Sequence, residues 1–290
     1  MRSPAIRMPS HDRGFGLIEL LITLVLSSIV LVAVMMSFFR TARDARTLTE
    51  VTDVRQSART AVQLVEREIR MAGSGWGRLN VYGNNSSGQP DTLLAVRPGY
   101  CAGTSNDSLV LVGAWKTSTT ISSGMPNASS VLKVADVAGF ANGDLIIITN
   151  GSSAHMMQVT GTNSSSMMIQ HNPASPYNNP GGHNATWPAS GYGAGANVYK
   201  ITISSYSFDA TSYRKPALIR HEYGQAPQVL AYNVDGFRVW YELQDGSWTR
   251  NPPNLSVVDK VSPVVLTRTT DSHAAVLRDS VWAAVQPRTF

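Results

Sequence analysis

Apolar or small side chains fill almost every position of residues 15–39, close to the start of the 290-residue chain. Glu19 is the only acidic residue in this run. Its last part, Leu20 to Phe39, would form a helix of about 30 Å at 1.5 Å per residue, which is enough to cross a bilayer core. The pattern therefore predicts a transmembrane helix over residues 15–39.

A second helical pattern follows the apolar run without a break. Residues 40–72 contain no proline or glycine, and their apolar side chains recur at spacings of three or four, as on one face of a helix. This stripe consists of Leu48, Val51, Val54, Ala58, Val62, Val65, Ile69 and Ala72. Gly73 and Gly75 then favour a helix end. We predict one continuous helix over residues 15–72, whose second half packs this stripe under a head.

Residues 73–290 have the pattern of a β-rich head. Short β-prone runs alternate with Gly, Asn, Ser and Pro, and the alternation of residues 237–243 is typical of a strand half-buried against a core. Close spacing with turns between the runs predicts antiparallel sheet, and hence an α+β fold. Strands are expected at 92–97, 108–115, 131–135, 145–149, 155–160, 167–171, 198–208, 217–221, 229–233, 237–243 and 280–286, the last at a sheet edge.

Two segments of the head depart from this plan. Residues 130–171 hold four closely spaced short strands, which predicts a small β insertion. Residues 172–197 are rich in Gly, Pro, Asn, Ser and Ala, which predicts a long surface loop or a partly disordered segment. Trp187, within this loop, is the tryptophan that we expect to touch a partner.

The residue types of the chain suggest no active site. Cys101 is the only cysteine, so the chain cannot form an intramolecular disulfide or a CxxC metal site. His155, His171, His183 and His221 stand far from one another and from any ligand-spaced partner. We therefore expect no catalytic residue, no metal and no cofactor, and a protein that is not an enzyme.

The net charge of +5 adds little to this picture. Part of it lies in the N-terminal leader, and the remaining basic residues are scattered rather than clustered on one segment. Nucleic-acid binding requires a concentrated basic surface, so the charge pattern argues against it.

The position of Glu19 and the residues before it need a further explanation. A carboxylate inside a membrane span costs roughly 2.5–3.5 kcal/mol on insertion scales. A basic leader precedes the span and ends at Gly14, whereas a secretory signal has a shorter apolar region with its cleavage site after it. An ordinary single-pass anchor would leave Glu19 and the Gly14-Phe15 pair unexplained.

These residues resemble the type IV prepilin signature, in which Gly14 precedes Phe15 and Leu17-Ile18-Glu19-Leu20 follows. The resemblance implies that a prepilin peptidase cuts after Gly14, that Phe15 is N-methylated, and that the leader of residues 1–14 is cytoplasmic. It also places Glu19 at the family's fifth mature position, where it would pair with a neighbouring subunit's N-terminus. Gly16 stands where many pilins have threonine, and no proline kinks the span.

A second block narrows the resemblance to minor pilins of the PilW type. Residues 61–73 (AVQLVEREIRMAG), and more weakly 143–147 and 234–239, are similar to this family. The resemblance implies a non-enzymatic subunit, held in the inner membrane with a periplasmic head, that helps to initiate or cap type IV pilus assembly. Its partners would be the prepilin peptidase, other minor pilins, the major pilin, inner-membrane lipid and the pilus assembly platform.

Two alternatives remain open. The chain could be a minor pseudopilin of type II secretion, which shares the same helix. It could also be a pilus-tip module for adhesion or DNA uptake, with residues 172–197 as the binding element.

Overall fold

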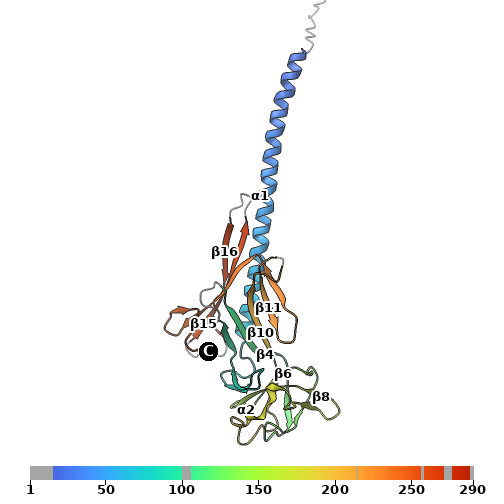
Figure 1. The fold of residues 1–290 in the computed structure, drawn as a ribbon, viewed down its shortest axis with the longest axis vertical. Helices are drawn as coiled ribbons and strands as arrows, with labels where there is room; N and C mark the ends of the chain where they lie inside the picture. Colours follow the sequence, from blue (N-terminus) through green and yellow to red (C-terminus); the bar gives the residue numbers. More distant parts are fainter. Residues whose placement is uncertain (1–15, 100–105, 214, 256–257, 271–275, 288–290) are drawn as a thin grey trace, which may run out of the picture. The chain divides into compact units, whose positions relative to one another are not determined.

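A computed structural model describes residues 16–99, 106–213, 215–255, 258–270 and 276–287 (Figure 1). The chain divides into two compact units, which we describe separately. The smaller unit contains residues 1–50 and 270–275, and the larger contains residues 51–269 and 276–290. Cys101, Gly14 and Phe15 lie outside the described residues.

The predicted long helix is present as α1 (Leu17–Met71), a single helix of 55 residues. It ends as the glycines predict, because Gly73 has a φ of 74° and its N–H donates to Val112 O at 2.8 Å. The buried side chains of the predicted stripe begin at Val54 and continue through Ala72, just past the end of the helix. Leu48 was expected in this buried stripe and is 67 % exposed. Helical periodicity shows which face is apolar but not how far along the helix that face is covered.

Most strands of the larger unit belong to one sheet of 12 strands. In chain order they are β1 (Val81–Asn84), β2 (Pro90–Leu93), β3 (Val96–Gly99), β4 (Ser108–Ser123), β5 (Leu132–Val134), β6 (Leu145–Thr149), β7 (Ala154–Gln158), β8 (Gly161–Asn163), β9 (Met168–Gln170), β10 (Asn197–Asp209), β11 (Ala217–Glu222) and β12 (Gln228–Tyr232). The spatial order is β2-β1-β7-β6-β10-β4-β5-β9-β8, with β11 and β12 added to β10, and β3 added to β4.

A second sheet of four strands has the order β14-β13-β15-β16. It consists of β13 (Val234–Leu243), β14 (Trp248–Thr249), β15 (Val258–Thr270) and β16 (Val276–Trp282). The expected last strand is β16, which lies at the sheet edge but begins at Val276 rather than Ser280.

Strand pairing is antiparallel, as expected, with one departure. β1 pairs with β7 in parallel, and Val81 lies opposite Ala154. The sequence between them contains several other strands, so the chain has enough length to cross over before the parallel partner. The architecture is nevertheless the α+β arrangement that the sequence predicts, with one long helix and a β-rich head.

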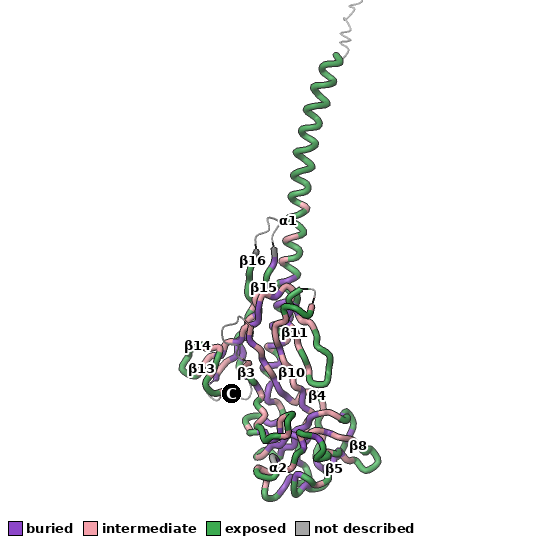
Figure 2. Tube along the Cα trace, viewed as in Figure 1, coloured by how far each residue is buried: buried purple, intermediate pink, exposed green. Residues whose placement is uncertain are grey.

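The main core joins the helix stripe to both sheets (Figure 2). Val65 and Ile69 of α1 are fully buried in the same cluster as Leu109 of β4 and Phe237 of β13. Burial of each such side chain contributes roughly 1.5–3 kcal/mol. The second half of α1 is therefore an integral part of the head.

The segments expected as an insertion and a loop have their own apolar cluster. Strands β6 and β7 join the main sheet beside β10, and β5, β9 and β8 continue it from β4. Residues 172–197 form a packed segment rather than a simple surface loop. They contain η1 (Pro176–Asn178) and the short helix α2 (Pro180–Asn184), and they bury His183 and Tyr192.

Candidate functional site: the apolar helix surface and the head

The first part of α1 presents an apolar surface to its surroundings. Large apolar side chains from Leu17 to Phe39 are at least half exposed, and the most apolar window of this helix has a mean hydropathy of 2.7. Among the described residues, α1 is the one helix long and apolar enough to cross a membrane. Exposed apolar surface of this extent requires lipid or other apolar helices around it.

Two hydroxyl groups within this surface form hydrogen bonds with the backbone of their own helix. Thr23 Oγ1 donates to Leu20 O at 2.9 Å, and Ser28 Oγ donates to Val25 O at 2.7 Å. These hydroxyls therefore do not need partners outside the helix.

Glu19 is the exception in this apolar surface. It lies in the first turn of α1, where the positive end of the helix dipole favours an acidic side chain. It is exposed, and no described residue forms an ion pair with it. A carboxylate in these surroundings can be neutralised by a positive group that another molecule supplies.

The end of α1 carries a buried charged cluster that sequence reasoning missed. Glu68 is 4 % exposed, and its Oε1 accepts hydrogen bonds from Arg220 Nη2 at 2.7 Å and Nε at 3.1 Å. Tyr206 OH donates to Glu68 Oε2 at 2.5 Å. Arg220 also donates to Ser204 Oγ at 2.9 Å and pairs with Glu222 at 3.0 Å. The cluster thus links α1 to β10 and β11 by hydrogen bonds.

The surroundings of this cluster keep the Tyr206 phenol neutral and the Arg220 guanidinium charged. Burial and the adjacent Glu68 carboxylate raise the pKa of Tyr206 far above its usual range. Burial alone would lower the pKa of Arg220, but Glu68 outweighs burial and raises it. The sequence contained one signal: Glu68 lies on the buried stripe, three positions after Val65 and four before Ala72.

Two histidines that are far apart in the sequence come together in the head. The ring centroids of His155 and His183 are 6.0 Å apart, and both side chains are fully buried. His155 Nδ1 lies 2.7 Å from Tyr192 OH, and its Nε2 lies 3.0 Å from Thr186 Oγ1. The interpretation of these histidines as isolated is therefore wrong for this pair.

Trp187 packs in the same place. Its ring centroid is 4.7 Å from that of His155 and 5.0 Å from that of Tyr192. Its side chain is partly buried against its own chain, and its expected contact with a partner stays a prediction. Among the described residues, no group of three or more His, Cys, Asp or Glu is placed to hold a metal ion.

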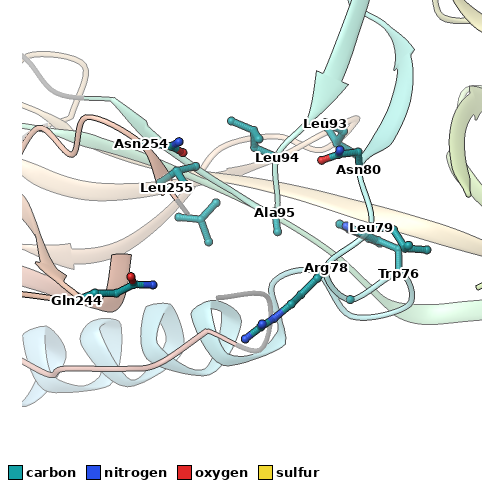
Figure 3. A pocket seen from close by; sticks show the side chains of 12 residues that line it. Trp76, Arg78, Leu79, Asn80, Leu93, Leu94, Ala95, Gln244, Asn254 and Leu255 are labelled. Carbon is teal, nitrogen blue, oxygen red and sulfur yellow. The ribbon is translucent and has the colours of Figure 1, made fainter. Parts of the chain in front are cut away.

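A cavity of about 410 Å³ opens beside the turn that follows α1 (Figure 3). Its lining comes from residues 76–80, residues 93–96 and the connections between strands of the second sheet, which supply Gln244, Asn254 and Leu255. Arg78 is the one charged residue of the lining, and there is no nucleophile beside a base. The cavity thus has none of the paired groups that acid–base or nucleophilic catalysis requires.

The comparisons with known proteins support the predicted prepilin-type motif at the N-terminus. The family model of the prokaryotic N-terminal methylation motif matches residues 9–35. No curated protein and no solved structure matched the chain. The motif indicates a type IV pilin- or pseudopilin-like protein, which is a structural subunit that a prepilin peptidase processes and that associates with other pilins.

Proposed function

We propose that this chain is a minor pilin of the PilW type, a non-enzymatic subunit that helps to initiate or cap type IV pilus assembly. The observation that carries the proposal is the coincidence of three features in one segment. The methylation motif covers residues 9–35, the part of it from Leu17 onward forms an exposed apolar helix, and Glu19 is the acidic residue within that part.

Each feature has a role in this proposal. A prepilin peptidase cleaves between Gly14 and Phe15 and methylates Phe15, which removes the leader of residues 1–14. The apolar helix holds the subunit in the inner membrane, with the head in the periplasm, until neighbouring pilin helices replace the lipid. The Glu19 carboxylate then forms an ion pair with the N-terminal amine of an adjacent subunit, because two opposite charges offset the cost of removing each from water.

The buried cluster at Glu68 is consistent with a subunit of a filament that is pulled along its length. The helix enters the filament and the head carries the contacts with other subunits, so the connection between them must resist pulling. Glu68, Tyr206 and Arg220 form this connection through buried, charge-assisted hydrogen bonds.

Deletion of the gene, with complementation by the intact chain, tests the proposal. We expect the deletion strain to lose surface pili and the complemented strain to regain them. Normal piliation with failure to secrete exoproteins would contradict the proposal and assign the chain to type II secretion. Normal piliation and secretion with loss of adhesion or DNA uptake would assign it to a tip-binding role.

A further inference from the structure

A long part of the head has no formal charge. Residues 145–199 contain no Asp, Glu, Lys or Arg, although these four residue types together make up 15 % of the chain. They form β6 to β9, η1 and α2, which gather at one end of the larger unit together with β5 (Figures 1 and 2). The exposed side chains in this part are mainly Asn, Ser, Thr and Gln. Residues 145–199 therefore offer hydrogen bonds without charge, although β5 beside them carries the exposed Lys133 opposite Met168 of β9.

A groove with a volume of about 470 Å³ lies beside this surface, lined by residues 129–131 before β5, by Thr160, and by β9 with the three residues that follow it. It falls within the usual range for small-ligand sites. Every residue of its lining belongs to an uncharged type or is His171. His171 Nε2 lies 2.9 Å from Ser130 O, and burial lowers the pKa of this histidine, so the groove stays neutral at neutral pH.

Local hydrogen bonds hold the segment that follows β9 in place. Asn172 N donates to Thr160 Oγ1 at 2.8 Å, and Asn172 Oδ1 in turn accepts from Ala174 N at 2.9 Å. Gln170 lies opposite Gly161 of β8, and a Cβ atom at Gly161 would come within 2.5 Å of Gln170 Oε1. The glycine therefore allows the Gln170 side chain to lie across the neighbouring strand.

Part of the hydrogen-bonding capacity of the groove is unused. The side-chain amide of Gln170 and the hydroxyl of Ser129 form no hydrogen bond with any described residue. Aliphatic surface accompanies these groups, because Met168 and Pro173 line the groove and Val131 at its rim is 53 % exposed. The lining of the groove therefore combines polar side chains with exposed or partly exposed apolar ones.

These features exclude two classes of ligand. A nucleic acid requires cationic side chains for its phosphates, and the groove has none. A peptide strand requires an unpaired sheet edge, but β9 already pairs with β5 and β8, and β5 with β4 and β9. The uncharged lining therefore favours a neutral ligand that is bound by side chains.

We propose that this groove binds a neutral glycan. A sugar ring has hydroxyl groups for the amide of Gln170 and the hydroxyl of Ser129, and a C–H face for Met168, Pro173 and Val131. The proposal does not depend on which filament the chain enters, since it concerns the head alone.

A binding experiment with the full chain, purified in detergent, tests the proposal. The chain is applied to an array that carries uncharged, sialylated and sulfated oligosaccharides and a single-stranded DNA. We expect retention on one or more uncharged glycans. The best of these is then titrated against three variants by ligand-observed NMR. Gln170→Ala should weaken binding about fivefold, the effect of a lost neutral hydrogen bond. Gln170→Trp should fill the groove and abolish binding. Gln228→Trp, at an exposed position of β12 outside the groove, is the matched control and should bind as the unaltered chain does.

The same experiment can overturn the proposal in three ways. The uncharged glycans could all fail to bind, or only the charged glycans or the DNA could bind. The Gln170→Trp and Gln228→Trp variants could also bind the neutral glycan equally well, which would place the ligand elsewhere. Retention of the unaltered fold by each variant is checked by circular dichroism before titration.

Discussion

Glu68 and Arg220 are separated by 152 positions in the chain, yet the Arg220 guanidinium donates twice to a single carboxylate oxygen of Glu68. Both side chains are nearly inaccessible to solvent. Removal of one partner from a buried pair leaves the other charge without compensation, which typically costs about 3–5 kcal/mol. The pair therefore makes the attachment of α1 to the sheet sensitive to a single substitution.

Glu68→Ala should lower the free energy of unfolding of the full chain in detergent by about 3–5 kcal/mol, measured by chemical denaturation. Glu66→Ala is the matched control, because Glu66 pairs with Arg70 near the surface of the same helix. It should cost less than about 1 kcal/mol. Equal losses in the two variants would show that the buried pair has no special role.

The mature chain is expected to begin at Phe15 and to carry a methylated amine. Intact-mass analysis of the protein from membranes or sheared filaments checks both points. Gly14→Glu should leave the precursor uncut, because a bulky charged residue replaces the glycine at the cleavage site. A mature protein that begins after Phe39 would contradict the pilin-like reading.

Val65→Asp should destabilise the head by more than about 3 kcal/mol. The change removes a fully buried valine, worth roughly 1.5–3 kcal/mol, and adds the cost of a buried carboxylate. Arg59→Asp introduces the same residue on an exposed face of α1 and should have a small effect. Thermal unfolding of the two variants should differ clearly, and similar midpoints would mean that the buried face is wrong.

Local patterns were enough to predict α1 and much of the β-rich head. The helix follows from apolar spacings of three and four, and β13 from the alternation of Phe237, Val239 and Tyr241. Strand β15 was missed, although it lies inside the second sheet. Pro263 interrupts its pattern, and proline normally argues against a strand with partners on both sides.

The contacts of the head could not be predicted in the same way. The burial of Glu68 was readable from its place on the helix stripe, but nothing in the local sequence points to Arg220. The approach of His155 to His183 likewise depends on how residues 172–197 fold back onto β7. Long-range contacts of this kind depend on tertiary structure, whereas the periodicity of one segment reports only its own faces.

Residues 172–197 should loosen on acidification. Burial and the neighbouring His183 lower the pKa of His155 to about 4, against about 6.5 when it is exposed. The neutral ring is the buried form, so the folded segment has its full stability above pH 6.5 and loses it as the pH falls from 6.5 towards 4. Burial also lowers the pKa of His183, and neither histidine forms an ion pair with a described residue that could stabilise a charged ring.

Hydrogen exchange of residues 172–197, corrected for the intrinsic effect of pH, should therefore be faster at pH 5 than at pH 7.5. His155→Gln removes one titrating ring and should reduce this difference, whereas His221→Gln, at an exposed position of β11, should leave it unchanged. Exchange that is independent of pH in the unaltered chain would contradict the prediction.

Glu19 should be required for assembly but not for processing. The peptidase acts at the Gly14-Phe15 junction, whereas the carboxylate is useful only when the amine of a neighbouring subunit is there to pair with it. Glu19→Ala removes a charge that is costly in the membrane, so the variant should still insert and be cleaved. It should then be depleted from sheared filaments, because the incoming amine has lost its partner.

Comparison of cleavage and filament incorporation in one strain measures both effects, with Glu50→Ala as a control on the same helix outside the apolar segment. Normal incorporation of Glu19→Ala would disprove the pairing and leave Glu19 without a role in assembly.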